Sequence, residues 1–531
     1  MLEEVIGLAL SICSLFAADI PKVSSRNETL SDYTNFEHRE SENDAQATFI
    51  NKEFDDDNYN DELSREDLVV NFSSQNTTCY DDNLRESGKV WKTLWKCLWT
   101  NLNIVVASII PVSFCIVLVY VAMNTAYSCL EWQNHNNNKT LPLSVKRAEV
   151  FGVCVEAIVL YLWFPFTMMI FFGWREFKAK FLSTAYVGVI FGELAVMYHL
   201  ISFQFNVYYS HSFYRYPTSV LFCVSSLCCT FVILSNIRIG KPFIPYSNCH
   251  IAALVLVEFI FCALLAYLNM SLIIPGFNRV RQNLYKFLIA TSSPLVAFIP
   301  TALCRHMALR RSSEVVHPGR SFIMVSMIRG GVIFVYRTMQ TDFKNIWIFI
   351  GLSLFSSVLN FLKKATKQIR FKMWKRIVSA LNKLQCCQRL QILPRGTPHS
   401  RRLRADLEIQ DILFEYNTLV LSQAYFISYQ LQSFDISTEP LLYEFLKRIA
   451  IGILIDFIFN CLTNFVQMYY YNIPISRVWK KYWKRHLSAN LIIVFVVIAY
   501  FGRGLESVFR SRFEETGESS VKYVIRNCSL F

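Results

Sequence analysis

The chain has 531 residues, of which 53% are hydrophobic and only 18% are charged, whereas soluble proteins average roughly 45–50% and about 25%. This excess of apolar residues excludes an ordinary soluble globular protein and indicates a protein that lies largely in lipid. The net charge of +13 combines an acidic first part, residues 1–88, with a strongly basic remainder. The basic residues lie mainly in short breaks between apolar runs, which favours loops beside anionic lipid over a nucleic-acid surface, so we expect no nucleic-acid partner.

The N-terminal region, residues 1–95, is predicted to be a separate acidic tail. Its first segment, Val5 to Ala18, is apolar but follows Glu3 and Glu4, the opposite of the charge that a signal peptide carries. We interpret it as an amphipathic or weakly anchored start, with a signal sequence as the alternative. The remainder is acidic and rich in Asn and Ser, which predicts a largely disordered tail.

Eight apolar runs follow one another within residues 96–362. An α-helix rises 1.5 Å per residue, so about 20 apolar residues cross a hydrocarbon core of roughly 30 Å. Together with runs further along the chain, they predict an all-α polytopic integral membrane helical bundle of about 10 to 11 transmembrane helices. The eight runs lie at about 103–124, 150–173, 184–206, 217–237, 250–274, 284–304, 320–340 and 345–362.

A basic segment, residues 363–405, follows the eighth run. Trp374 and Leu381 belong to a set of apolar residues at helical spacing among Lys and Arg, a pattern that predicts an amphipathic basic helix bound to anionic inner-leaflet lipids. Binding of a calmodulin-like partner is the alternative. Cys386 and Cys387 stand beside this helix and are candidate lipidation sites.

The orientation of the bundle follows from Lys and Arg, which are enriched on the cytoplasmic side of membrane proteins. The basic segment 363–405 is therefore cytoplasmic, and counting runs backwards puts the N-terminal tail there too. Lys286 and Arg337 fall into the breaks expected outside. The N-glycosylation sequon at Asn138 then lies on the outer face, where it can be used.

Residues 406–505 hold two clear apolar runs, 446–470 and 488–502, and an ambiguous stretch at 409–430. This stretch is either a polar span or a surface helix. If it crosses the membrane, the strongly basic break between the two apolar runs is cytoplasmic and the C-terminal tail, 506–531, is outside. We prefer this arrangement of eleven spans over the alternative of ten.

The sharpest polar pattern lies in the run 446–470. Asp456, Asn460, Asn464 and Gln467 recur at i, i+4, i+8 and i+11, which puts them on one helical face. A carboxylate at the centre of a bilayer costs about 2.5–3.5 kcal/mol, so Asp456 should face other helices, a partner or water. The stripe is either a substrate or ion pathway or a set of interhelical hydrogen bonds.

A second group of ionisable residues lies in the earlier runs. Arg329 is the natural counter-charge for one of the intramembrane carboxylates, and the sequence does not say which. We include the group in the predicted substrate or ion pathway. Its members are Glu156, Glu193, Glu258 and Arg329.

Two further patterns concern helix packing. Gly188 and Gly192 form a GxxxG pair, near the same stripe as His199, which lets another helix approach closely. Pro294 and Pro300 both interrupt the sixth run, and broken helices free backbone carbonyls that can line a cavity.

Catalytic motifs are missing from the sequence, which has no HExxH, GxSxG, P-loop or GxGxxG pattern. Most of the 16 cysteines lie inside apolar runs and do not indicate a disulfide framework or a zinc site. We therefore expect no enzyme, no metal site and no cofactor.

The patterns together favour a transporter or channel for a small ionic or polar solute that uses intramembrane carboxylates. The alternatives are a membrane receptor that signals through its basic cytoplasmic loop, and a lipid-handling or structural membrane protein. The lipid bilayer and the solute are the expected partners. The sequence is also compatible with a homo-oligomer. The usable sequon suits the plasma membrane or an endomembrane.

Overall fold

The computed structural model describes residues 87–125, 129–135, 141–205, 216–240, 247–310, 319–381, 398–502, 504–509 and 524–528. Within these ranges the chain is built from helices and contains no strand beyond one isolated bridge, which confirms the all-α prediction. The predictions for Asn138, Cys386, Cys387 and residues 1–86 lie outside the described residues.

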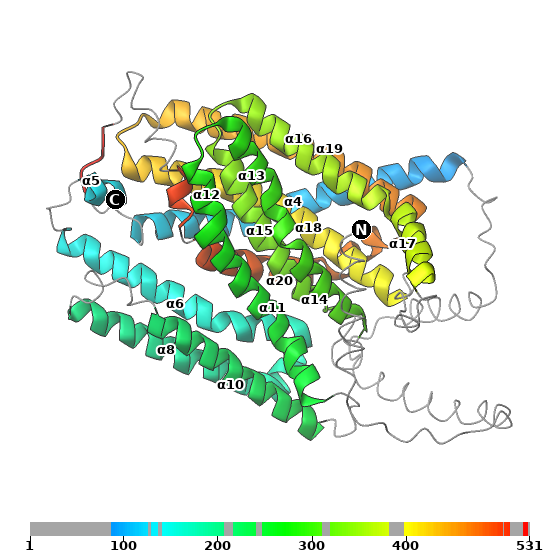
Figure 1. Cartoon of the computed structure of the whole chain (residues 1–531), viewed down its shortest axis with the longest axis horizontal. Coiled ribbons are helices and arrows are strands. Elements are labelled where there is room, and N and C mark those ends of the chain that lie inside the picture. Colours follow the sequence, from blue (N-terminus) through cyan, green and yellow to red (C-terminus); the bar gives the residue numbers. More distant parts are fainter. Residues whose placement is uncertain are drawn as a thin grey trace. The chain divides into compact units, whose positions relative to one another are not determined.

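The helices follow one another along the chain with short connections (Figure 1). The first of them, α4, begins at Ser87 and so includes residues expected in the tail. The bounds are α4 Ser87–Thr125, α5 Leu130–His135, α6 Leu143–Phe172, α7 Trp174–Glu176, η2 Phe177–Phe181, α8 Leu182–Gln204, α10 Tyr216–Gly240, α11 Asn248–Leu268, η4 Asn269–Ile273, α12 Ile274–Arg279, α13 Asn283–Val296, α14 Phe298–Arg310, α15 Ile323–Asp342, α16 Ile346–Ala365, α17 Lys367–Leu381, α18 Pro398–Ser433, α19 Thr438–Tyr470 and α20 Ile475–Phe501.

Nine helical segments in the described ranges are long and apolar enough to cross a membrane. They include α6, α10, α16, α19 and α20 as single helices, and the pair α13 and α14 as one interrupted span. Large apolar side chains such as Leu194 and Phe231 are exposed on them, as expected for surfaces that meet lipid. The protein is thus a multi-pass membrane protein.

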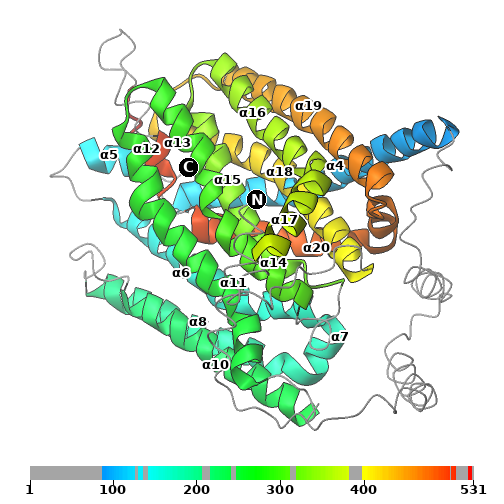
Figure 2. The same ribbon diagram turned by 45° about the vertical axis from the view of Figure 1, so that its right-hand side comes forward.

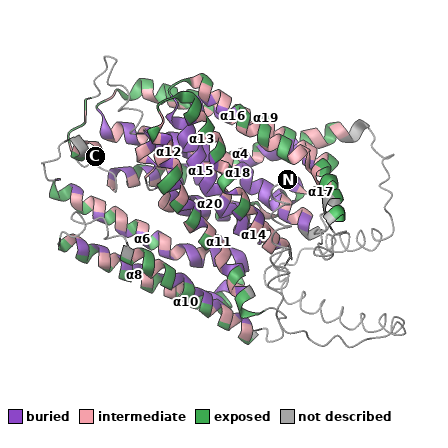
Figure 3. Ribbon diagram, viewed as in Figure 1, coloured by how far each residue is buried: buried purple, intermediate pink, exposed green. Residues whose placement is uncertain are grey.

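Two further helices of membrane-spanning length, α15 and α18, are not among these nine, because polar residues interrupt their apolar character. Eighteen of the 20 residues of α15 are buried, and no residue of α18 from Arg401 to Ser433 is exposed. Figure 3 shows this contrast between α15 and the more exposed α8 and α10. The ambiguous stretch 409–430 is therefore an interior helix and not a surface helix.

The interior position of α15 and α18 follows from their neighbours. α15 packs against α11, α13, α14, α18 and α20, and α18 packs against α19 and α20 as well. Helices that are enclosed by protein need no apolar outer face and can carry polar residues toward one another. This arrangement positions the candidate site.

Helices α6, α8 and α10 pack against one another and lie side by side at one edge of the bundle (Figures 1 and 2). The buried stripe of α8 includes Gly188, Gly192, Ala195 and His199. A Cβ atom at Gly188 would lie 2.9 Å from the backbone oxygen of Tyr161 in α6. The GxxxG prediction of close helix packing is confirmed.

The sixth span is interrupted where its prolines predict it. α13 ends at Val296 and α14 begins at Phe298, so the break falls between Pro294 and Pro300. Single prolines in α4 and α6 leave those helices continuous. Two prolines six residues apart remove two backbone donors from neighbouring turns, which explains why this span divides.

A disulfide joins Cys129, after α4, to Cys528 near the C-terminus. Beside it the C-terminal segment pairs with the end of α18: the Asp435 amide donates to the Val524 carbonyl at 2.9 Å, and the Arg526 amide donates to the Ser433 carbonyl at 3.0 Å. The cysteine pattern did not predict this bond, because the two residues are 399 positions apart.

The close contact at Gly188 gives a packing prediction. Replacing Gly188 with Ala should lower the thermal stability of the purified protein, because the new methyl group meets the α6 backbone; overpacking of this kind costs about 1–3 kcal/mol. Gly351→Ala is the matched control, since nothing lies within 4 Å of that position. Equal melting temperatures for the two variants in detergent would contradict the proposed packing.

Candidate functional site

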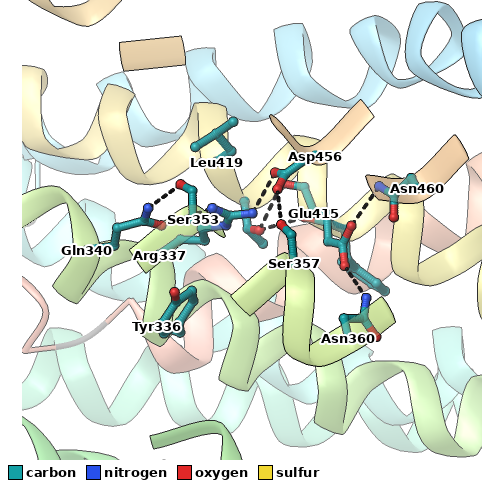
Figure 4. Close-up of polar contacts among 12 residues, drawn as sticks. Tyr336, Arg337, Gln340, Ser353, Ser357, Asn360, Glu415, Leu419, Asp456 and Asn460 are labelled. Atoms are coloured by element: carbon teal, nitrogen blue, oxygen red, sulfur yellow. Dashed lines mark hydrogen bonds and ion pairs between the residues drawn. The ribbon is translucent and has the colours of Figure 1, made fainter. Parts of the chain in front are cut away.

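The predicted polar stripe of α19 faces the interior of the bundle. Asp456, Asn460, Asn464 and Gln467 are all buried, whereas Leu454 on the same helix is exposed. The stripe meets α16 and α18, and Figure 4 shows how Asp456 and Asn460 lie among side chains of the neighbouring helices. Sequence spacing thus identified the correct face of α19.

Asp456 forms an ion pair with Arg337 of α15, with 2.5 Å between Oδ2 and Nη2. The hydroxyl of Ser357 in α16 donates to Oδ1 of Asp456 at 3.2 Å. Both charged side chains are almost fully buried. Arg337 was expected in an outer break between runs, and that prediction is wrong, because α15 continues to Asp342 and holds Arg337 inside the bundle.

Glu415 of α18 lies beside Asp456 in the bundle interior (Figure 4). Its Oε1 accepts a hydrogen bond from Asn360 of α16 at 3.1 Å, and its Oε2 accepts one from Asn460 of α19 at 2.7 Å. Each oxygen of this carboxylate is therefore held by a neutral amide. The two amides come from α16 and α19, two helices that pack against each other.

Two cations and two carboxylates follow toward the start of α18. Arg329 lies 2.7 Å from Asp411, measured from Nη1 to Oδ2. Lys364 of α16 forms an ion pair with Glu408 and lies 3.9 Å from Asp411. The counter-charge of Arg329 is thus Asp411, which was not among the predicted site residues.

The first turns of α18 carry another carboxylate, Asp406, which is fully buried. It accepts from Arg402 at 3.0 Å and lies 3.5 Å from Arg485. The Nε2 atom of His486 in α20 lies 3.0 Å from its Oδ1. Three nitrogen-bearing side chains therefore surround one acid at this end of the bundle.

Polar contacts also continue from Arg337 toward the C-terminal end of α15. Gln340 accepts from Arg337 at 2.9 Å and donates to Ser353 at 2.6 Å. One residue further, Thr341 accepts from Gln423 of α18 at 2.9 Å.

The end of α15 carries a last buried ion pair. Asp342 lies 3.5 Å from Lys286 of α13, and both side chains are almost fully buried. Lys286 was expected in an outer break, but the packing of α13 against α15 encloses it.

These groups of contacts follow one another as a polar row along the α15, α16, α18 and α19 interfaces. On α18 the row extends from Asp406 to Gln423, which is about 25 Å at 1.5 Å per residue and close to the thickness of a hydrocarbon core. We define the interior charge cluster as the seven charged residues in its middle: Arg329, Arg337, Lys364, Glu408, Asp411, Glu415 and Asp456.

Other predicted site residues lie away from this cluster. Asn464 donates to Asn101 of α4 at 2.7 Å, an interhelical hydrogen bond of the packing type. Glu156 of α6 is half-buried and Glu193 of α8 is exposed. Glu258 of α11 is buried, and its Oε1 has no hydrogen-bond partner among the described residues. The structure does not gather these three carboxylates into one site.

Three acids of the cluster on α18 were not among the predicted site residues. Glu408, Asp411 and Glu415 recur at i, i+3 and i+7, the spacing of one helical face. They lie in or directly before the stretch 409–430, which the sequence left ambiguous. The same regular spacing that drew attention to α19 was present in α18 and could have identified these residues.

Within the described residues, no group of three or more His, Cys, Asp and Glu side chains could hold a metal ion. No protein-family model matches the chain, and neither a curated protein sequence nor a solved structure is significantly similar to it.

The Arg337–Asp456 pair gives a stability prediction. Arg337→Gln leaves a buried carboxylate without its cation and should cost about 3–5 kcal/mol, whereas the double variant R337Q/D456N should recover most of that loss because both charges are gone. Thermal unfolding of the purified full chain in detergent measures the effect. Lys447→Gln, at an exposed position, is the control for loss of a positive charge.

Additive destabilisation in the double variant would contradict direct pairing of the two side chains.

Proposed function

We propose that the protein is a membrane transporter or channel for a small ion, and that the polar row through α15, α16, α18 and α19 is its pathway. The observation that supports this function is the length of the row. Asp406, Asp456 and Asp342 belong to the start, the middle and the end of it, so polar side chains follow one another along nearly the whole helical interior.

The energetics of burial also support a pathway. Interhelical hydrogen bonds in membranes contribute only about 0.6 kcal/mol on average, and an apolar replacement of a buried ion pair is often as stable. Packing alone therefore gives little reason to place seven charges in one interior cluster. Intramembrane charges that face a bundle interior are typical of ion and proton pathways.

The proposal includes an orientation. The break between α6 and α8 and the start of α18 carry many Lys and Arg residues, and both lie at the end of the bundle that holds Asp406. We place this end in the cytoplasm, where the basic segment with α17 binds anionic lipid. The Cys129–Cys528 disulfide follows the C-terminal ends of α4 and α20 in the chain. We place it on the other side of the membrane, in the oxidising compartment.

This orientation requires α15 and α18 to cross the membrane as well, which gives eleven crossings with a cytoplasmic N-terminal tail. Asn138, nine residues after Cys129 in the chain, then lies on the outer side, where its sequon can carry a glycan.

Ion movement is the first test of the function. The full chain reconstituted into liposomes should move protons, sodium, rubidium or chloride at a rate about tenfold or more above empty liposomes, and Asp456→Asn should remove most of this flux because Asp456 lies in the row. Encapsulated pyranine reports protons and radioactive tracers report the other ions. Glu439→Gln, an exposed position at the start of α19, should retain the flux.

The absence of flux for all four ions in correctly folded protein would overturn the proposal and favour the receptor or structural alternatives. Flux that Asp456→Asn and Glu439→Gln leave equally intact would place the pathway outside the polar row.

Protease protection tests the orientation. In sealed microsomes an epitope tag inserted within residues 510–523 should be protected, and a tag within residues 382–397 should be digested. Loss of both tags would mean that the segments share one side of the membrane and that the number of crossings between them is even.

A further inference from the structure

Glu415 differs from the other carboxylates of the interior charge cluster. Glu408 pairs with Lys364, Asp411 with Arg329, and Asp456 with Arg337. Glu415 forms no ion pair with a described residue and is held only by the amides of Asn360 and Asn460. Figure 4 shows these amides on opposite sides of the carboxylate.

The charge balance of the cluster gives the consequence of this difference. Three cationic side chains meet four carboxylates, so the cluster has one excess negative charge when every group is ionised. Uncompensated charge is costly in a low-dielectric interior. One bound monovalent positive charge makes the cluster neutral, and Glu415 is the carboxylate that lacks a partner for it.

The surroundings of Glu415 favour a proton over a metal ion. A hard cation requires about six oxygen ligands, but both oxygens of Glu415 face amide N–H groups. The hydroxyl of Tyr416 is buried beside Asn460. A proton needs no shell of ligands, and the amides can turn to accept it.

We infer that Glu415 is an exchangeable proton site at the centre of the polar row. This inference rests on the proposed transport function and names the ion that the row carries. A proton adds to one carboxylate oxygen and forms an O–H bond. The hydrogen bond that the amide N–H of Asn360 or Asn460 donates to that oxygen is lost, the amide group rotates, and its carbonyl oxygen accepts a hydrogen bond from the new O–H.

Several charged or titratable groups act on this proton from the surrounding helices. They are Arg337 from α15, Lys364 from α16, Asp411 and Tyr416 from α18, and Asp456 from α19. The negative groups favour binding of the proton and the cations favour its release. Movement of one helix against its neighbours changes this balance and so changes the occupancy of Glu415.

Infrared difference spectroscopy tests the inference without any flux measurement. When the purified full chain is acidified, the C=O band of a newly protonated carboxyl group should appear, and Glu415→Gln should remove that component. Glu258→Gln is the matched control, since Glu258 is also buried but lies in α11, and it should retain the component.

A second variant keeps the test independent of the folding of Glu415→Gln. Asn460→Leu removes a hydrogen bond that stabilises the charged form of Glu415. The carboxyl band should therefore appear at a pH about one unit higher than in the unmodified protein, which corresponds to a tenfold change in proton affinity.

Three results would overturn the inference: a band unchanged in Glu415→Gln, a band unaffected by Asn460→Leu, or a carboxylate band of Glu415 that responds to sodium at constant pH. The last result would identify a metal-cation site. A Glu415 band in a protein without ion flux would support the proton site and reject transport.

Discussion

The burial of charge inside a bundle that stands in lipid is the constraint on which this structure depends. A single unpaired ion in such an interior is expensive, so each of the ion pairs Arg337–Asp456, Arg329–Asp411 and Lys286–Asp342 fixes one helix against another. The pairs join α15 to α13, α18 and α19. Loss of one partner therefore affects both the local charge and the positions of two helices.

This constraint also explains why the helices fall into two kinds. The outer helices, such as α8 and α10, have low polarity and pack through narrow stripes of small residues like Gly188. The inner helices α15 and α18 are enclosed by protein and carry five of the seven residues of the interior charge cluster. The other two, Lys364 and Asp456, come from α16 and α19. Apolar helices form the outer layer of the bundle and the polar helices form its interior, because backbone and side-chain polar groups must be satisfied within the protein.

The sequence predicts the apolar outer helices better than the pairing of polar residues in the interior. A long apolar run identifies a membrane helix by itself, and regular spacing was enough to orient α19, because Asp456 and Asn460 repeat every turn. Pairing depends on which helices are neighbours, and that information is spread over the whole chain. Arg337 and Lys286 were assigned to breaks between runs, and Glu415 lies in the stretch that the sequence left ambiguous, because each is tolerated only through partners 45 to 119 residues away.

The Cys129–Cys528 disulfide makes the order of synthesis relevant to folding. Cys129 leaves the ribosome 399 residues before its partner, which at about 5–20 residues per second is a delay of roughly 20–80 s. During that interval Cys129 cannot form its final bond, and the helices from α5 to α20 are being made. The finished bond can form only when α20 has been made and the last segment has returned to the end of α18. In the cell, oxidation of this pair marks a chain whose assembly is complete, and a persistent free thiol at Cys129 distinguishes an unfinished one.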